Sequence, residues 1–214
     1  MDIKVSVIMP SLNVADYIRE CIESVIRQTL KEIEIICVDA GSNDGTREIL
    51  EEYAQKDARI TIADSGIRSY GRQVNEGIAA AKGKYVAVLE TDDFVPDDMY
   101  KKLYLLAEEH ALDYIMADFK TFYDDEKEGR VYRSAEVFKD TPWIYNKVLS
   151  LMDHAHIYNA GDVTLWRGIF SRKFLETNYQ KVASYAAYPL VLRLFKKRTV
   201  KTYSVNHACY GDQG

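Results

Sequence analysis

Apolar residues follow two alternating patterns along the first 119 residues of the chain. Short, mostly apolar runs rich in Ile and Val are typical of strands buried on both faces. The intervals between them place apolar residues three or four positions apart, which is the spacing of an amphipathic helix. Strands are expected, each separated from the next by a helix, over residues 3–9, 33–38, 60–63, 85–89 and 114–119. This alternation predicts an α/β fold with a mostly parallel sheet and right-handed crossovers.

The pattern weakens after Phe119. The charged stretch 124–130 is typical of a solvated turn, and Trp166 lies in an apolar segment that spans 161–174. Further helices are expected over 142–153 and 190–195, and a last strand over 200–205. We expect residues 1–119 and 120–214 to form two halves that share one sheet. The final residues show no clear terminal element, so we also consider that the chain is cut short at its carboxyl end.

Composition narrows the class of protein. With 214 residues, 47% of them hydrophobic, the chain can bury a large core. A net charge of −5 argues against nucleic acid as the main partner. The three cysteines are odd in number and lack metal-ligand spacing, which is typical of reduced thiols. No apolar run is long enough to span a bilayer, and the first residues do not resemble a secretory signal. We therefore expect a cytoplasmic protein.

An acidic cluster follows the apolar run 85–89. Glu90, Asp92 and Asp93 come at the end of this predicted strand, and open α/β sheets bind ligands at the carboxyl ends of their strands. Like charges this close repel one another unless a cation or hydrogen-bond donors compensate them. We interpret the cluster as a divalent metal site that holds a nucleotide diphosphate. The alternative is a polar turn that happens to be acidic.

The loop at residues 10–15 separates two classes of nucleotide-binding protein. Pro10 is expected to end the first strand, since proline cannot donate to a central ladder. The loop has no glycine, which excludes the dinucleotide-binding fingerprint, and the chain has no phosphate-cradling Gly-x-x-x-x-Gly-Lys-Ser/Thr motif. The charge of the phosphates must then be neutralised by other means. Mn²⁺ or Mg²⁺ held by one or two carboxylates is the means that this sequence offers.

Four segments in this order resemble the motifs of family 2 glycosyltransferases, of the type that builds bacterial cell-surface polysaccharides. They are residues 5–13, residues 35–46, residues 69–86, and Glu90-Thr91-Asp92-Asp93, where the family carries an Asp-x-Asp-like signature. A fainter likeness covers 165–175. The resemblance implies a GT-A fold, which is Rossmann-like, with a mostly parallel sheet flanked by helices.

The resemblance also implies an activity. The chain would be an inverting glycosyltransferase that moves a sugar from a nucleotide-diphosphate donor, a UDP-sugar, to a glycan or a lipid-linked acceptor, with help from Mn²⁺ or Mg²⁺. Residues 1–119 would bind the nucleotide sugar, and residues 120–214 would form the acceptor side of the same domain. Because such acceptors are often lipid-linked, peripheral contact with the inner face of the membrane is a second possible location.

By the same resemblance, the donor would contact Pro10, Ser11, Leu12, Asn13, Asp39, Tyr70, Gly71, Arg72, Asn75 and Asp92. The loop 10–13 would contact the nucleoside, and Asp39 would read the base or the ribose. The alternative for Asp39 is a strand-end carboxylate that caps the next turn. Ala40 stands where the commoner family form has a second acid. Residues 70–75 would contact the diphosphate or the sugar, although Arg72 could equally be a solvated surface residue.

The same resemblance assigns metal binding to Asp93 and Asp92. Of the two, Asp92 would also contact the ribose, the sugar or a metal-bound water. Glu90 is expected to support the site structurally. We expect Asp44 to order its own loop through bonds between its side chain and the backbone.

The catalytic base has no clear position. Inverting transfer needs a carboxylate that deprotonates the acceptor hydroxyl, and Ala187 stands where the family carries an Asp. Asp162 is the nearest candidate, with a loop or cap carboxylate as its alternative role. Asp153, His154 and His156 have no better support. A donor-binding module with weak or no transferase activity is therefore the alternative function. A nucleotidyltransferase would normally need a glycine-rich, basic loop after the first strand, which is missing here.

Overall fold

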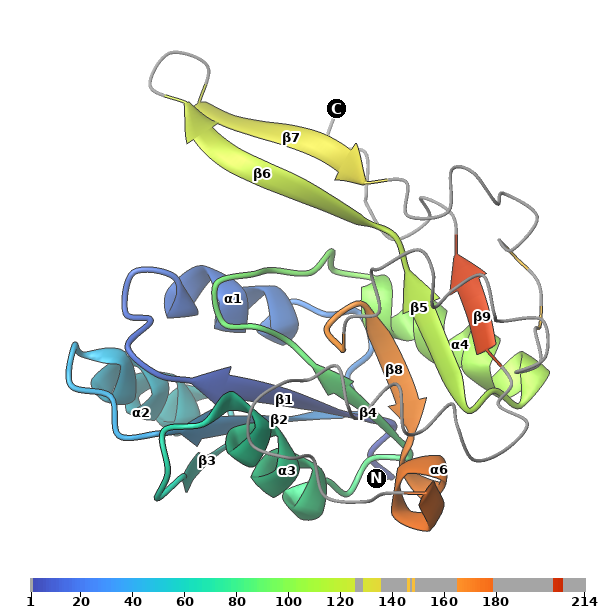
Figure 1. Cartoon of the computed structure of the whole chain (residues 1–214), viewed down its shortest axis with the longest axis horizontal. Coiled ribbons are helices and arrows are strands. Elements are labelled where there is room, and N and C mark those ends of the chain that lie inside the picture. The colour runs from blue at the N-terminus through green and yellow to red at the C-terminus, as the bar shows by residue number, and fades with distance from the viewer. Residues whose placement is uncertain are drawn as a thin grey trace.

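A seven-stranded mixed sheet forms the centre of the molecule (Figure 1). The computed structural model describes residues 2–125, 129–135, 146, 148, 165–178 and 202–205. The strands follow the order β3-β2-β1-β4-β8-β5-β9. In chain order they are β1 Val5–Ser11, β2 Ile33–Asp39, β3 Ile60–Asp64, β4 Tyr85–Val88, β5 Tyr114–Ala117, β8 Gly168–Ser171 and β9 Thr202–Val205. Strand β8 runs antiparallel to both of its neighbours, and the other pairs in the sheet are parallel.

Helices cover both faces of this sheet. They are α1 Ile18–Ile26, α2 Thr46–Lys56, α3 Tyr70–Ala80, α4 Met99–His110 and α6 Arg172–Asn178. Apolar residues of α1, α2 and α4 form one buried cluster with Val7 and Met9 of β1. Ile8 points to the opposite face because side chains alternate along a strand, and there it lies against Gly77 of α3. Helix α3 therefore covers the face of the sheet opposite to α1, as Figure 1 shows.

The elements predicted over residues 1–119 are confirmed, and so is the mostly parallel sheet. Their ends differ from the expected ones by a few residues, because apolar spacing marks the buried centre of an element better than its ends. The position of Pro10 is a correction: it lies inside β1, opposite Val38. The carbonyl groups of Lys4 and Ile8 accept bonds from Tyr85 and Leu89, so even-numbered residues of β1 face β4. Strand β4 has ended at Val88, and the missing N–H of Pro10 therefore costs no ladder bond.

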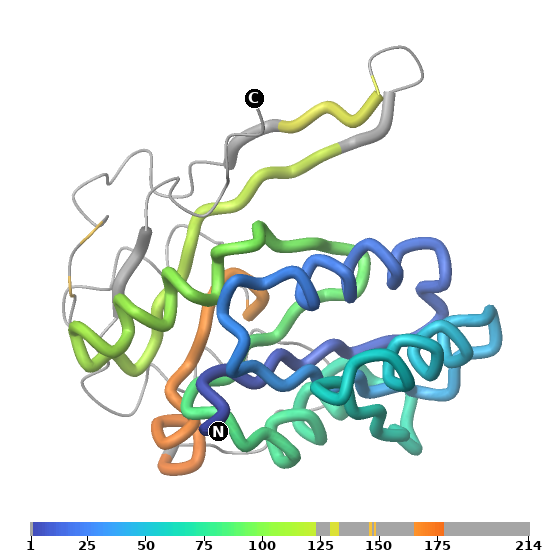
Figure 2. Tube along the Cα trace, turned by 180° about the vertical axis from the view of Figure 1, so that it is seen from behind, coloured from blue at the N-terminus to red at the C-terminus, as the bar shows by residue number. Residues whose placement is uncertain are grey.

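The strand expected over 114–119 also differs, because it breaks at Asp118. Strand β5 ends at Ala117, and β6 Phe119–Asp125 pairs with β7 Gly129–Ala135 as an antiparallel hairpin. Of the charged stretch 124–130, Asp124 and Asp125 pair with Arg130 and Gly129 at the outer end of the two strands. Figures 1 and 2 show the hairpin projecting away from the central sheet.

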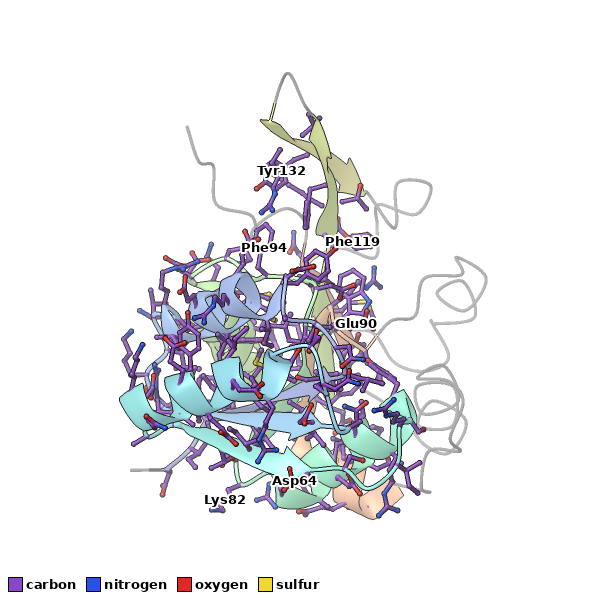
Figure 3. All side chains as sticks on the ribbon, turned by 90° about the vertical axis from the view of Figure 1, so that its left-hand side faces the viewer. Asp64, Lys82, Glu90, Phe94, Phe119 and Tyr132 are labelled. Atoms are coloured by element: carbon purple, nitrogen blue, oxygen red, sulfur yellow. The ribbon has the colours of Figure 1, made fainter. Side chains whose placement is uncertain are left out.

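Aromatic and charged contacts fasten the hairpin to the rest of the molecule. The rings of Phe122 and Phe94 lie 5.3 Å apart, and the guanidinium of Arg130 lies 4.5 Å from the Phe122 ring. Arg130 also forms an ion pair of 2.5 Å with Glu20 on α1. In Figure 3, Phe94 lies near the point where the hairpin leaves the molecule, with Tyr132 farther out. The hairpin thus contacts the chain directly after the acidic cluster.

The apolar segment around Trp166 contains strand β8 and the residues 165–167 that lead into it. Leu165, Ile169 and Phe170 are buried, and the Trp166 ring packs edge-on against Phe119 at 4.8 Å. Among the described residues, no helix is both long enough and apolar enough to cross a membrane. The helix expected over 190–195 lies outside the described residues, and so does the one expected over 142–153 except for Asn146 and Val148.

Gly168 makes the tight fit of β8 testable. A Cβ at this position would lie 2.0 Å from the carbonyl oxygen of Ile115 in the neighbouring strand, so the backbone would have to move. We expect Gly168→Ala to lower the free energy of unfolding by about 2 to 3 kcal/mol, measured by urea denaturation. The control is Gly66→Ala, since no atom lies within 4 Å of the Cβ position there. Equal stability of the two variants would contradict the close approach of β8 to β5.

Candidate functional site

The carboxyl ends of β1, β2 and β4 bring three loops to one edge of the sheet. Glu90, Asp92 and Asp93 lie in the loop after β4, and each can offer one oxygen within 4.8 Å of those of the other two. Glu90 and Asp93 are half-buried, whereas Asp92 is exposed. The structure therefore brings together the three carboxylates that the sequence singled out.

Hydrogen bonds anchor this acidic loop to the sheet. The N–H of Leu89 donates to the carbonyl of Ile8 at 2.9 Å, and the Thr91 hydroxyl donates to the carbonyl of Pro10 at 3.1 Å. The N–H of Asp93 closes the turn on the carbonyl of Glu90 at 3.0 Å. The backbone thus holds three like charges near one another, although they repel.

Burial and mutual repulsion raise the pKa values of two of these carboxylates. Burial, followed by the charges of Asp92 and Glu90, raises the pKa of Asp93 to about 6. Burial also raises the pKa of Glu90, partly opposed by the hydrogen bond from Tyr70. Among the described residues, no basic side chain forms an ion pair with any of the three carboxylates. A set of oxygen ligands with uncompensated negative charge fits a divalent cation.

Helix α3 contributes two side chains to this edge of the sheet. The Tyr70 hydroxyl donates to Oε1 of Glu90 at 3.2 Å, and burial raises the pKa of this tyrosine. One turn further, Gln73 is 3% exposed and donates from Nε2 to the carbonyls of Ser11 and Val38, at 2.8 and 2.7 Å. Gln73 thereby holds α3 against the carboxyl ends of β1 and β2.

The other predicted residues of α3 are placed less uniformly. Gly71 is buried and Asn75 is half-buried. Arg72 is exposed and forms an ion pair of 2.5 Å with Glu76 on its own helix, as a solvated surface residue would. Contact of these residues with a diphosphate or a sugar stays a prediction.

Side chains of the second loop hold the first loop in place. The N–H of Asn13 donates to Oγ of Ser42 at 3.0 Å, that of Val14 to Oγ1 of Thr46 at 2.8 Å, and that of Ala15 to Oδ2 of Asp44 at 3.0 Å. Three successive backbone amides are thus already used within the protein and are not free to cradle a phosphate. Asp44 also accepts bonds from Thr46, which confirms that it orders its own loop.

The predicted nucleoside contacts in loop 10–13 differ in exposure. Pro10 and Ser11 are buried, and the Ser11 carbonyl also accepts a bond from the N–H of Ala40. Leu12 is half-buried and Asn13 is exposed, so a ligand at this loop would meet these two first. Asn13 adopts a positive φ of 55°, which asparagine tolerates better than most residues.

Asp39 is 4% exposed at the end of β2. Its Oδ1 accepts a hydrogen bond of 2.5 Å from the Ser42 hydroxyl and a longer one of 3.3 Å from the Ser42 N–H. These bonds are those of a strand-end carboxylate that caps the next turn, which was the alternative for this residue. Contact between Asp39 and a nucleoside stays a prediction.

Sequence reasoning did not single out Gln73, Thr46 or the hydroxyl of Ser42. For Gln73 a signal existed, because a polar residue adjoins Val74 on the apolar face of a predicted helix. The base candidates Asp162, Asp153, His154 and His156, together with Ala187, lie outside the described residues.

The clamp at Gln73 can be tested by stability. We expect Gln73→Leu to lower the free energy of unfolding by about 2 kcal/mol, because two buried carbonyls each lose a hydrogen bond. Urea denaturation of the full chain measures this change. Gln55→Leu on the exposed face of α2 is the matched control and should change stability little. An equal effect of the two substitutions would contradict the role assigned to Gln73.

The raised pKa of Asp93 predicts how stability varies with pH when a chelator is present. The folded state holds this proton more tightly than the unfolded state, so the favourable contribution is full below about pH 4 and is lost as the pH rises past about 6. Asp93→Asn removes that loss and should be more stable than the original chain by about 2 kcal/mol at pH 7, with little difference at pH 4.

Urea denaturation between pH 4 and 8 measures both proteins. Thr91→Ser removes no charge and is the control. Its free energy of unfolding should differ from that of the original chain by an amount that does not vary with pH. A constant difference for Asp93→Asn would show that the charge of this carboxylate is compensated in the folded chain.

Comparison with solved structures supports the same architecture. Residues 1–349 of S. aureus TarS superpose with a TM-score of 0.75 at 20% identity, covering 97% of this chain and 59% of that one. The mannosyltransferase PcManGT from Pyrobaculum calidifontis, solved with GDP-Man and Mn²⁺, gives a TM-score of 0.67 at 15% identity, covering 99% of this chain and 58% of that one. At this level of identity the likeness shows the fold, which is GT-A.

Sequence comparison gives the family. The uncharacterized glycosyltransferase EpsJ of Bacillus subtilis is 34% identical over 172 residues, which cover 80% of this chain and 49% of EpsJ. The chain thus spans about half the length of this relative. The model of glycosyl transferase family 2 matches residues 6–178, a stretch that includes the acidic cluster and the loops after β1 and β2. The chain therefore belongs to glycosyl transferase family 2.

Proposed function

We propose that the chain is a metal-assisted, inverting glycosyltransferase that moves a sugar from a UDP-sugar to a glycan or a lipid-linked acceptor. The observation that carries this proposal is the cluster of Glu90, Asp92 and Asp93 at the carboxyl end of β4, beside the loops after β1 and β2. TarS has been solved with UDP and with UDP-GlcNAc, and PcManGT with GDP-Man and Mn²⁺. These complexes support a nucleotide-sugar donor and a divalent metal.

Residues at different positions in the site would bind different parts of the donor. Asp93 and Asp92 would hold Mn²⁺ or Mg²⁺, with Glu90 oriented by Tyr70 behind them. When bound, such a cation neutralises the diphosphate that leaves during sugar transfer. The backbone amides of residues 13–15 are used within the protein. The phosphates would therefore be bound by the cation on the carboxylate cluster and by the start of α3.

At the other end of the donor, Asp39, Leu12 and Asn13 would contact the nucleoside. A carboxylate accepts hydrogen bonds and does not donate them, so Asp39 suits a ribose hydroxyl or a ring N–H of the base. The acceptor hydroxyl must lose its proton as it attacks the sugar, and Asp162 is the candidate base from the sequence.

The remaining parts of the proposal concern the acceptor side and the location. Residues 120–214 would form the acceptor side, and Phe119 with Trp166 marks where that half joins the sheet. Two buried free thiols, Cys21 and Cys37, support a reducing, cytoplasmic location, with the inner face of the membrane as the place where a lipid-linked acceptor would be met. A donor-binding module without turnover is the second candidate, because Ala187 stands at the position expected for the base.

Asp93→Asn tests the metal-dependent donor site. Since this substitution removes a charged metal ligand, we expect it to weaken the binding of UDP in the presence of Mn²⁺ by at least about tenfold, measured by titration calorimetry. Asp97→Asn is the matched control, because Asp97 is an exposed carboxylate on the same segment and should leave binding unchanged. Equal affinity of the original chain and Asp93→Asn for UDP would refute the role of Asp93. Release of sugar from the donor then separates an active transferase from a binding module.

A further inference from the structure

The hydroxyl of Ser42 bonds to both loops that border the nucleoside end of the proposed site. It accepts the N–H of Asn13 at 3.0 Å and donates to Oδ1 of Asp39 at 2.5 Å. Asn13 returns a bond to the same loop, because its Oδ1 accepts the N–H of Asn43 at 2.9 Å. Ser42 thus lies between the end of β2 and the loop after β1.

This arrangement fixes the orientation of the Asp39 carboxylate. Oδ1 takes the hydroxyl of Ser42, whereas Oδ2 has a long contact of 3.4 Å from the Ser42 N–H and lies 3.9 Å from Nη1 of Arg47. Arg47 is engaged more closely by Glu51 and Asp64. A carboxylate oxygen has two lone pairs, so Oδ2 can still accept a bond from a ligand.

The other bonds between the two loops do not reach Asp39. Thr46 and Asp44 hold the amides of Val14 and Ala15, and they lie on the side of the loop that leads into α2. Of the side chains in the described part of this loop, that of Ser42 alone donates a hydrogen bond to the Asp39 carboxylate. Loss of the Ser42 hydroxyl therefore removes the shortest hydrogen bond to this carboxylate, together with the acceptor for the N–H of Asn13, while leaving the bonds to Val14 and Ala15 in place.

We propose that Ser42 is a positioning residue for nucleoside recognition: its hydroxyl turns Asp39 so that Oδ2 faces a donor group of the base or ribose. This inference rests on the proposed donor site and names a residue that acts through Asp39 without contacting the ligand. The diphosphate end of the donor is held elsewhere, at the carboxylate cluster, so the effect of Ser42 is confined to the nucleoside end.

The test compares UDP with inorganic pyrophosphate, each titrated calorimetrically against the full chain with Mn²⁺. Ser42→Ala should weaken the binding of UDP about tenfold and leave that of pyrophosphate within about twofold. Ser42→Thr and Ser42→Val have nearly the same shape and differ by the hydroxyl, so the first should bind UDP like the original chain and the second like Ser42→Ala. Asn43→Ala, which removes an exposed side chain next to Ser42, should change neither affinity.

Thermal unfolding of each variant shows that it is folded, and the pair at position 42 serves if Ser42→Ala is not. Unchanged binding of UDP by Ser42→Val would overturn the inference, and so would an equal loss of UDP and pyrophosphate. In both cases the proposed donor site would stand, because the original chain still binds UDP with Mn²⁺. If the original chain binds no nucleotide with Mn²⁺, the proposed function fails and the inference fails with it.

Discussion

The parallel pairing of β1 with both β2 and β4 is the constraint on which the site depends. Since all three strands run in the same direction, the loops after Ser11, Asp39 and Val88 leave the sheet at one edge. The register then decides which side chains meet there. Ser11 lies opposite Asp39, and Ile8 lies opposite Val88, so β4 ends early and its carboxylates follow within a few residues. A shift of one strand by one residue would turn its side chains to the wrong face.

Two kinds of polar interaction occur at this edge of the sheet, one stabilising and one destabilising. The hydrogen bonds of Gln73, Ser42 and Thr46 satisfy groups that would otherwise be buried without partners. The carboxylates of the acidic cluster are instead pushed together and partly removed from water, which is unfavourable by itself. Such local cost is typical of binding sites, where the surrounding packing keeps groups in an arrangement that a ligand later stabilises.

Local pattern was sufficient to predict the first five strands of the sheet and the helices between them, since each element buries its own apolar residues. It also located the acidic cluster, because a buried strand that ends in three acids is visible in the sequence. Pro10 was misplaced because the sequence does not show how far β4 extends beside β1. The roles of Ser42 and Gln73 depend on which loops and helices meet in space, and no local pattern carries that information.

The place of β8 has a consequence for the order in which the chain can fold. Val86 of β4 pairs with Phe170, and so does Tyr114 of β5. Strand β4 can pair with β1 early, but its other edge and the whole of β5 lack this partner until the chain has been extended by more than fifty further residues. In the described sheet, β5 pairs with β8 and β9 and with no earlier strand. During synthesis the open edge of β4 and all of β5 therefore wait for segments of high sequence separation, which slows folding and leaves strand edges able to pair with other chains. Strand β8 joins the two parts of the sheet. A chain on the ribosome is therefore prone to aggregation until β8 has been synthesised and has paired.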